Sequence, residues 1–593
     1  MAAIKNYKTE WDLKDLLLGD DDPAQNIKLA KYEKDCRQFI NRWKEQEDYL
    51  VDPIVLKTAL NEYEDLMAKY SGGGEVGFYF ALRNCLNQND PKLKAKDNKI
   101  TDLTVKIGNE LEFFTNRLSK VSDIKQKEFI SSPYLKEYKH FLETLFLEAK
   151  HLLSESEEKV VNLMSGTAYS NWIKMTSDFL SKEERNGKSF SEIYNLIGDR
   201  KKAVRDSANK AFNEIISKHS DVAEAEINSI LQSKKVNDEL RGYKRPDTSR
   251  HISDDIDTKT IDALLFAVES RYDISKRYYR LKAGLFKVKK LKYHERNVDY
   301  GEIKKKFSFD ESVQLAGKSL EKLDGDFYQI FTDMLRKGCI DVYPKKGKES
   351  SEFCINWLKE QPAYILLNHS GMISDVTTLT HEMGHAINDE MVKKKQNFLN
   401  MFTPVSTAEV ASTFMQDFVL EELSKGITDK EKLTLSMIRL NDAVSSVIRQ
   451  VACYKFELEL HEKFRSQGYL SKQEIGSIFQ KHMQSYMGEF VEQSKGSENW
   501  WIPWSHIRRF FYVYSYASGN LISQYMRNQI KKDPRYIDKV KEFLSAGSSC
   551  APKEIFARLG INIEDKNFWL EGLKEIDELL TKTERLAKKL KKI

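Results

Sequence analysis

Residues Thr380-His381-Glu382-Met383-Gly384-His385-Ala386 carry the strongest structural signal in this chain. They place two histidines four residues apart, with a glutamate between them, in a segment whose apolar residues recur every three or four positions. This spacing predicts an amphipathic helix. Its expected apolar face consists of Val376, Leu379, Met383, Ile387 and Met391. On a helix the two histidines lie about 40° apart, one turn above the other, so both rings can reach one ion.

This arrangement predicts a zinc site with hydrolytic chemistry. Imidazole is the usual nitrogen ligand of zinc, and a catalytic zinc keeps one coordination position for water. Glu382 projects beside His381 and His385, where a carboxylate can take a proton from that water. The alternative is that the spacing arises by chance, but the helical setting favours a metal site.

The third ligand is expected to be a carboxylate from another element. In the three-histidine form of this motif a third histidine follows the second by six residues. Met391 occupies that position here, so the three-histidine site is absent. Glu390 lies about 140° around the helix from His385 and is expected to face elsewhere. The third ligand should therefore come from another element.

Glu409 is the predicted third ligand. Ser406 and Thr407 can cap a helix that continues through regularly spaced apolar residues, which would place Glu409 in its first turn among small residues. A first-turn glutamate in solvent is the alternative interpretation, since the helix dipole favours it. Glu421 and Glu422 are the next choices for the ligand, although both fit an exposed helix face.

The chain resembles the oligoendopeptidase F branch of the thimet-oligopeptidase-like zinc peptidases. The resemblance covers most of the sequence and rests on an ordered set of motifs around the metal motif. These are Ile340-Asp341-Val342-Tyr343 with Lys346-Gly347-Lys348, Tyr364-Ile365-Leu366-Leu367-Asn368, Ala408-Glu409-Val410-Ala411-Ser412 and Phe511-Tyr512-Val513-Tyr514-Ser515-Tyr516-Ala517.

The resemblance implies roles for single residues. It implies one Zn2+ on His381, His385 and Glu409, with Glu382 as general base and acid. It further implies that His506 and a tyrosine of the Tyr512-to-Tyr516 cluster, Tyr514 first, stabilise the transition state. The residues after that histidine, Ile507-Arg508-Arg509, depart from the family pattern, which has another aromatic residue there.

The fold expected from the resemblance is a predominantly α, two-lobed, zincin-like metallopeptidase. Such enzymes admit short unstructured oligopeptides into a deep channel between mostly helical lobes. The predicted domains are an N-terminal helical lobe, residues 1–190, and a catalytic domain, residues 191–593. Residues 24 to 70 read as helix before a break at Ser71-Gly72-Gly73-Gly74, and further amphipathic helices follow to residue 236.

A small β-sheet is predicted just before the metal helix. Residues 339 to 343, 353 to 356 and 363 to 368 are short apolar or alternating runs between glycine and lysine clusters. We expect residues 363 to 368 to form an edge strand along which an extended substrate pairs. A purely structural hairpin is the alternative.

Composition favours a large cytoplasmic enzyme. The 95 basic and 90 acidic residues leave a net charge of only +5, and no basic stretch is interleaved with aromatic residues, so no nucleic-acid partner is expected. Six cysteines without paired spacing suit a reducing compartment. Residues 1 to 7 have no apolar signal core, and no stretch is long enough to cross a membrane.

Two other functions remain open at this point. One is a catalytically inactive helical scaffold that binds peptides and keeps a structural metal. The presence of Glu382 argues against it, because a structural site has no use for a general base. The other is a metal-dependent hydrolase of non-peptide amides, for which the same activated water would serve.

Overall fold

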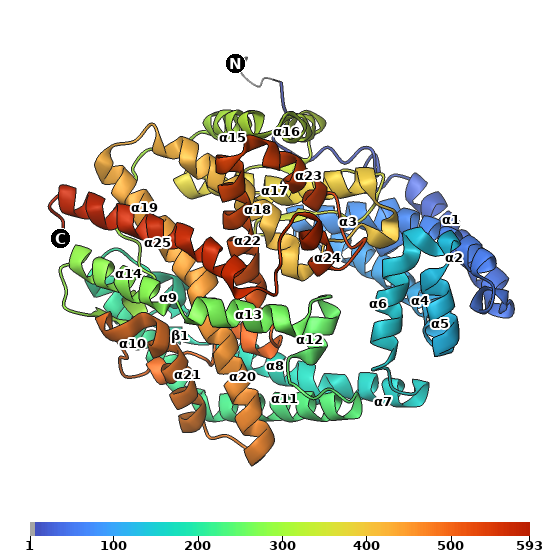
Figure 1. Ribbon diagram of the computed structural model, residues 1–593, viewed down its shortest axis with the longest axis horizontal. Coiled ribbons are helices and arrows are strands. Elements are labelled where there is room, and N and C mark those ends of the chain that lie inside the picture. The colour runs from blue at the N-terminus through green and yellow to red at the C-terminus, as the bar shows by residue number, and fades with distance from the viewer. Residues whose placement is uncertain (1–5) are drawn as a thin grey trace. The chain divides into compact units, whose positions relative to one another are not determined.

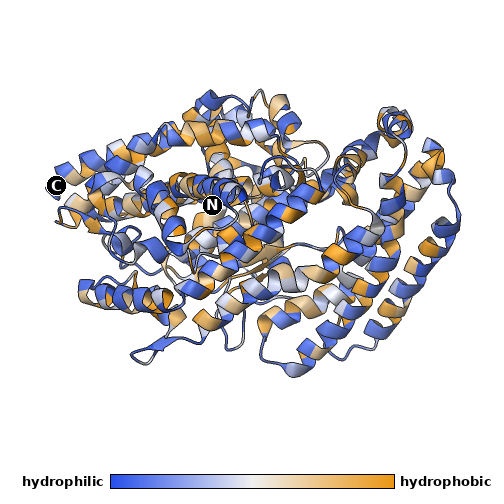
Figure 2. Ribbon diagram, turned by 90° about the horizontal axis from the view of Figure 1, so that it is seen from below, coloured by the Kyte–Doolittle hydropathy of each residue, from blue (hydrophilic) through white to orange (hydrophobic). Residues whose placement is uncertain are grey.

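The computed structural model describes residues 6–593. The segment predicted to lack a signal core falls partly on residues 1–5, which lie outside the described residues. The described chain is predominantly helical, as predicted. Its helices are amphipathic, and Figure 2 shows apolar and polar residues alternating along them. No helix among the described residues has the length and apolar character that crossing a membrane requires.

The chain divides into two units, each assembled from separate stretches of sequence. Unit 1 comprises Met1–Lys150, Lys304–Lys425 and Met526–Gly560, and unit 2 comprises His151–Ile303, Gly426–Tyr525 and Ile561–Ile593. The predicted boundary at residue 190 falls inside unit 2. The division into residues 1–190 and 191–593 stays a prediction.

Unit 1 contains the helix of the metal motif, α17, and the helix of the predicted third ligand, α18 (Figure 1). Its helices are α1 (Ala24–Glu45), α2 (Pro53–Tyr70), α3 (Gly74–Leu86), α4 (Pro91–Ser119), α5 (Asp123–Ser131), α6 (Lys139–Ala149), α15 (Phe309–Leu323), α16 (Gly325–Lys337), α17 (Ile373–Lys395), α18 (Val405–Ser424), α23 (Ile537–Leu544) and α24 (Pro552–Arg558).

Unit 2 is also built mainly from helices. They are α7 (Glu155–Ser165), α8 (Asn171–Ser181), α9 (Phe190–Leu196), α10 (Lys202–Lys218), α11 (Ser220–Leu240), α12 (Thr248–Ser253), α13 (Thr258–Glu269), α14 (Tyr272–Leu285), α19 (Asp429–Ala443), α20 (Arg449–Gln467), α21 (Lys472–Met487) and α25 (Lys566–Lys589). Helix α22 (Tyr514–Lys532) begins among the residues of unit 2 and ends among those of unit 1.

Local sequence explains where several of the N-terminal helices begin. Asp52 precedes Pro53 and accepts a hydrogen bond from the Ile54 backbone N–H at 2.7 Å. Asp90 and Pro91 start α4 in the same way. An aspartate cap followed by proline at the first helical position satisfies orphan donors and presets the backbone. The Gly72-Gly73-Gly74 break between α2 and α3 has three positive φ angles, as the predicted turn requires.

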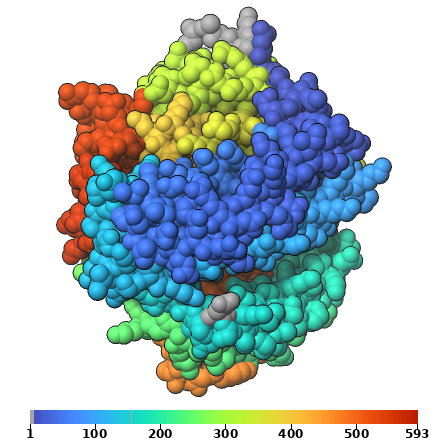
Figure 3. Space-filling view, turned by 90° about the vertical axis from the view of Figure 1, so that its right-hand side faces the viewer, coloured from blue at the N-terminus to red at the C-terminus, as the bar shows by residue number. Residues whose placement is uncertain are grey.

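The distant segments of unit 1 meet through aromatic side chains. The Trp11 indole N–H donates to the Ile365 carbonyl at 2.8 Å, and the ring of Phe78 stacks on Trp357 with centroids 5.3 Å apart. Figure 3 shows the blue N-terminal helices against the yellow-green residues of the 304–425 stretch. These contacts tie the sheet region to the start of the chain, which sequence patterns could not predict.

The predicted sheet is present, but its strand order corrects one prediction. Strands β4 (Ile340–Asp341), β5 (Phe353–Ile355) and β6 (Tyr364–Leu366) form a sheet in the order β4-β6-β5. Strand β6 pairs parallel with β4 and antiparallel with β5. The prediction that residues 363 to 368 form an edge strand is therefore wrong, because both sides of β6 are already hydrogen-bonded.

The remaining strands form two short pairs in unit 2. Strands β1 (Glu184–Arg185) and β2 (Lys188–Ser189) make an antiparallel hairpin, whereas β3 (Leu291–Lys292) pairs parallel with β7 (Val491–Glu492). No disulfide joins the six cysteines, all of which lie within the described residues.

Candidate metal centre

Helix α17 presents the two histidines of the motif as the spacing predicts. Its apolar face is buried: Val376, Leu379, Met383 and Ile387 are fully inaccessible, and Met391 is 8% exposed. The rings of His381 and His385 lie on the half-buried side, with centroids 5.1 Å apart and nearly perpendicular planes. Packing of the apolar face therefore fixes the direction in which both imidazoles point.

A glycine allows the second helix to approach the first very closely. A Cβ atom added at Gly384 would lie 2.5 Å from the Ser412 Cα and 2.6 Å from the Ala411 carbonyl oxygen of α18. Carbon atoms normally stay at least about 3.5 Å apart. Only glycine at position 384, facing small residues on α18, permits this separation of the two helices.

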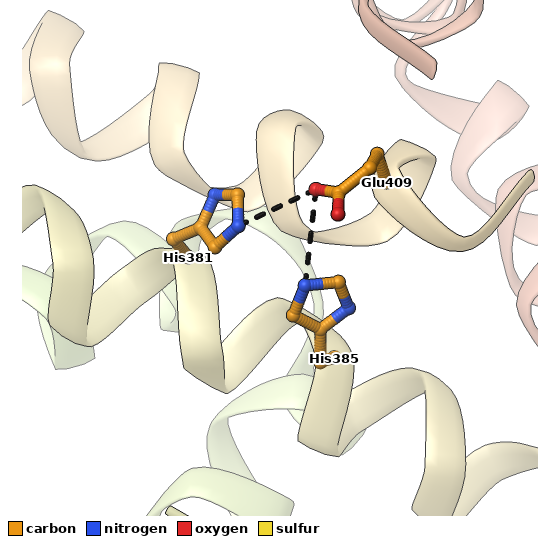
Figure 4. Close-up of side chains that lie close together, drawn as sticks. All are labelled: His381, His385 and Glu409. Carbon is orange, nitrogen blue, oxygen red and sulfur yellow. Dashed lines mark ion pairs between the residues drawn. The ribbon is translucent and has the colours of Figure 1, made fainter. Parts of the chain in front are cut away.

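Glu409 of α18 reaches both histidines (Figure 4). Its Oε2 lies 3.4 Å from the His381 Nε2 and 3.9 Å from the His385 Nε2. Ligand atoms of the three residues all lie within 4.8 Å of one another. Two nitrogen donors and one carboxylate oxygen therefore converge on one point, as predicted from the sequence.

The start of α18 differs from the prediction. The helix begins at Val405 after Pro404, and neither Ser406 nor Thr407 caps it with its side chain. Glu409 is consequently the fifth residue of the helix and lies in its second turn rather than its first. The helix thus begins two or three residues earlier than a cap at Ser406 or Thr407 predicts, because a proline can precede a helix without a capping side chain.

The other acidic residues considered as ligands are engaged elsewhere. Glu390 accepts from the Ala363 backbone N–H at 3.0 Å and pairs with Lys393, so it faces away from the histidines as expected. Glu421 pairs with Arg527 at 3.0 Å, and Glu422 pairs with three lysines of unit 1.

Two residues that support the site were not predicted. The Gln416 side-chain oxygen accepts a hydrogen bond from the His381 Nδ1 at 3.1 Å, which leaves Nε2 to face Glu409. The Ser412 hydroxyl donates to the Glu409 Oε2 at 3.0 Å. Residues 412 and 416 follow Glu409 by three and seven positions on one helix face, so this periodicity could have identified both.

Burial and charge set the protonation of the three converging groups. Burial raises the pKa of Glu409, but its hydrogen bond to His381 and the charges of both histidines outweigh burial and lower that pKa to about 2. Burial lowers the pKa of His385 to about 4, so this imidazole is neutral at pH 7. Burial lowers the pKa of His381, but Glu409 and Glu382 outweigh burial, so this pKa is raised above its ordinary value.

Glu382 lies beside the cluster in a different environment. It is 7% exposed, and burial is the main cause that raises its pKa to about 7. Glu409 and Glu352 also raise this pKa, whereas His381 and the Cys354 backbone N–H lower it. Glu382 can therefore hold or release a proton near neutral pH. Its interaction with Cys354 places it beside β5, an outer strand of the sheet.

The second acidic and histidine cluster among the described residues has a different character. Asp206, His294 and Glu295 lie close together in unit 2. However, Arg205 donates to Glu295 at 2.7 Å, and Lys202 donates to Asp206 at 2.7 Å. These cations already neutralise the carboxylates, so the cluster is a partly buried ion-pair network.

His506 lies in unit 2, in the short 3₁₀ helix Ser505–Arg508. Its Nδ1 hydrogen-bonds to the Tyr512 hydroxyl, and its ring lies 6.1 Å from that of Tyr516. Burial and nearby arginines lower the pKa of His506. A neutral imidazole carries one proton, so in the tautomer in which the Tyr512 hydroxyl donates to Nδ1, the ring has its proton on Nε2 and can donate from there.

Tyr514 differs from its two neighbouring tyrosines. It is fully buried, and its hydroxyl donates to Asp254 at 2.6 Å within unit 2. Tyr512 and Tyr516 instead surround His506, with their rings 6.0 Å apart. The Tyr514 hydroxyl thus has an internal partner, whereas the hydroxyl of Tyr512 belongs to the histidine cluster.

Comparison with known proteins assigns the family. A model described as peptidase family M3 matches residues 195–575, and one described as oligopeptidase F matches residues 118–181. The chain belongs to peptidase family M3. The predicted resemblance is confirmed, and this M3 peptidase is an enzyme of the metallo-oligopeptidase class.

Relatives of this M3 peptidase extend over nearly its whole length. An oligoendopeptidase F homologue of Borreliella burgdorferi is 24% identical over 580 residues, which covers 95% of each chain. An oligoendopeptidase F homologue of Lactococcus lactis is 23% identical over 527 residues, covering 86% of this chain and 87% of the relative.

Solved structures share the fold. A suspected peptidase from Chlamydophila abortus superimposes with a TM-score of 0.86 at 20% identity and covers 98% of both chains. Oligoendopeptidase F of Enterococcus faecium gives a TM-score of 0.66 at 17% identity, covering 95% of this chain and 98% of its own. The fold class predicted from the sequence is therefore confirmed.

Proposed function

We propose that this M3 peptidase is a zinc-dependent endopeptidase that hydrolyses short unstructured oligopeptides. The observation that carries the proposal is the convergence of His381, His385 and Glu409 beside the buried carboxyl of Glu382. Relatives named oligoendopeptidase F support oligopeptides as the substrate class.

The donor set fits zinc. Two imidazole nitrogens and one carboxylate oxygen are a usual catalytic zinc set, and tetrahedral bonds of about 2.0–2.1 Å place neighbouring ligands roughly 3.3 Å apart. The Glu409 Oε2 lies 3.4 and 3.9 Å from the two histidine nitrogens, close to that separation. The hydrogen bond from His381 to Gln416 supports the tautomer that a zinc ligand needs.

The protein groups would then divide the work of peptide hydrolysis. A zinc ion held by His381, His385 and Glu409 supplies Lewis acidity and lowers the pKa of water. Glu382 takes the proton from the attacking water and passes it to the leaving nitrogen. Its burial keeps the carboxyl able to carry a proton near neutral pH.

We extend the proposal to His506 and the tyrosines beside it. Negative charge develops on the peptide carbonyl oxygen in the transition state, and fixed O–H or N–H donors stabilise it. The His506 Nε2–H and a hydroxyl of Tyr512 or Tyr516 suit this role. Tyr514 was the first choice from the resemblance, but its hydrogen bond to Asp254 favours a structural role.

The corrected strand order points to a different edge for substrate pairing. Strand β5 (Phe353–Ile355) is an outer strand of the sheet and pairs only with β6 in the described ladders. Its Cys354 N–H interacts with Glu382. We propose that an extended peptide pairs along β5, beside the general base.

The absence of disulfides among the cysteines also supports the proposed cytoplasmic location.

Glu382→Gln tests the proposed chemistry. The variant should bind one zinc per chain, measured by elemental analysis, and keep the wild-type melting temperature. Its cleavage of a quenched fluorescent peptide mixture should fall by about 10²–10⁴-fold, the usual contribution of a general acid-base group. Glu421→Gln on α18 is the matched control and should cleave normally.

Two outcomes would contradict the proposal. One is wild-type cleavage by Glu382→Gln, which removes the general base assignment. The other is full activity after zinc has been stripped with a chelator, which removes the metal from the mechanism.

A further inference from the structure

A groove of about 1150 Å³ lies within unit 2, and its lining includes none of His381, His385 and Glu409. Its walls are α7, the π-helical turn Gly166–Ser170 that follows it, the start of α8, α11 and the end of α20. Figure 1 labels α7, α8 and α11, which carry most of these walls. We call it the α7–α11 groove. Its volume is slightly larger than that of sites that hold small organic ligands, about 300–1,000 Å³.

The walls of the α7–α11 groove expose large apolar side chains. Met164 is 57% exposed, Leu240 is 53% exposed and Tyr469 is 55% exposed, and all three line the groove. Trp172 and Val236 add further apolar area. Clustered apolar side chains on a soluble surface mark binding sites more often than isolated ones do.

Charge in the groove is already neutralised. Among the described residues, Lys234 and Arg241 are the only charged ones that line it. Lys234 pairs with Asp238, and Arg241 forms two hydrogen bonds with Glu158 at 2.6 and 2.8 Å. The groove therefore suits an uncharged occupant. Amide side chains in the lining, such as Asn162 and Gln232, can donate to and accept from peptide groups.

One end of the groove is built from the segment that holds His506 and Tyr512. Phe510 lines the groove, its ring lies 5.8 Å from that of Tyr169, and the Tyr169 hydroxyl donates to the Arg508 carbonyl. The groove is thus continuous with the segment proposed to stabilise the transition state.

The backbone at this end is strained. Phe510 has φ +52° and Phe511 has φ +59°, a conformation that is unfavourable for non-glycine residues and clusters at functional sites. The buried Glu457 holds this backbone by accepting from the Phe511 N–H at 2.9 Å. The Phe510 side chain, which this backbone carries, lines the groove.

We propose that the α7–α11 groove binds a large apolar side chain, and the extended peptide around it, in the oligopeptide substrate. The inference rests on the proposed peptidase function and adds to it a preference for peptides that carry such a residue. An extended peptide suits this groove because its walls are apolar, its lining includes neutral amide side chains, and it is continuous with the His506 segment.

Peptide binding to the full-length, zinc-loaded Glu382→Gln protein tests the proposal. The probe is a fluorescein-labelled peptide of Gly, Ser and Ala with one central Phe, and its partner has Ser in place of Phe. Fluorescence anisotropy should give at least about tenfold tighter binding for the Phe peptide, as expected for burying one aromatic side chain. Met164→Lys and Leu240→Lys should each remove most of that difference.

Leu163→Lys is the matched control, because Leu163 adjoins Met164 on α7, is 75% exposed and does not line the groove. It should leave the preference for the Phe peptide unchanged. In the active enzyme, Met164→Lys should raise KM for the Phe peptide and leave kcat unaltered, a split that general destabilisation would not produce.

Three results would overturn the inference. The preference for Phe could survive both groove substitutions, or Leu163→Lys could remove it equally. Alternatively, Met164→Lys could convert a dimer to a monomer without changing peptide affinity, which would make the groove a contact between copies of this chain. Failure of the proposed chemistry is recognised separately, as cleavage of the probe by Glu382→Gln in mass spectrometry.

Discussion

Gly384→Ala tests whether the separation of α17 and α18 determines metal binding. The added methyl group would lie 2.5 Å from the Ser412 Cα and 2.8 Å from the Ala411 carbonyl carbon. Restoring ordinary contact requires α18 to move by about 1 Å, because carbon atoms pack at roughly 3.5 Å or more. Glu409 would move with α18, whereas His381 and His385 would stay on α17.

A displacement of this size exceeds what a zinc site tolerates. Ligand distances in metal sites hold to within about 0.2 Å of their ideal values. We therefore expect zinc affinity to fall by at least about tenfold, and peptide turnover at limiting zinc to fall by about 100-fold, since a misplacement of 1 Å can cost that much. Overpacking should also lower the free energy of unfolding by about 1–3 kcal/mol.

The assay combines zinc titration against a competing chelator, steady-state peptide cleavage and denaturant unfolding. Gly108→Ala is the matched control, because Gly108 lies inside α4 and a Cβ there meets nothing within 4 Å. Removing a helical glycine without a clash should stabilise the protein by up to about 1 kcal/mol. If Gly384→Ala binds zinc and cleaves peptides like the wild type, the separation of α17 and α18 does not determine metal binding.

Two further predictions follow from single side chains. Gln416→Ala should weaken zinc binding by about 10–100-fold in a chelator competition, since it removes the hydrogen bond that orients His381, and unchanged affinity would contradict the role of Gln416. Burial lowers the pKa of Lys282 from 10.5 to about 7, so between these pH values the unfolded chain binds a proton that the folded protein lacks. Lys282 should therefore make stability rise with pH by up to about 1.4 kcal/mol per unit in that window. The slope from pH 7 to 9, measured by urea unfolding, should flatten in Lys282→Met, and an equal slope would contradict the assignment.

The sequence was sufficient for features encoded within one helix. The spacing of His381 and His385 and the apolar residues around them depend on a period of 3.6, which any single helix displays. The same reasoning led to Glu409 among small residues. It also excluded Glu390, which indeed bonds to the Ala363 backbone.

Features that depend on long-range pairing could not be predicted in this way. Strands β4, β5 and β6 have similar lengths and compositions, so the pattern alone could not assign β6 to the centre of the sheet. The hydrogen bond from Trp11 to Ile365 joins residues 354 positions apart. Both residues belong to unit 1, which consists of three separate stretches of sequence, so no single boundary along the chain could define it. Tyr514 resembles Tyr512 in sequence, and only its partner Asp254 distinguishes it.

The metal centre is best understood as a property of the contact between two helices. Burial of the Glu409 carboxylate raises its pKa, and His381 and His385, which face it across that contact, outweigh burial together with the Ser412 hydroxyl and lower the pKa. The same contact brings Gln416 of α18 to His381 of α17, while Ser412 supports Glu409 from within α18. The interactions that cross from α17 to α18 depend on the absence of a side chain at Gly384. Ligand geometry, protonation and supporting hydrogen bonds should consequently fail together when the helices separate, whereas substitutions elsewhere on α18 should affect them one at a time.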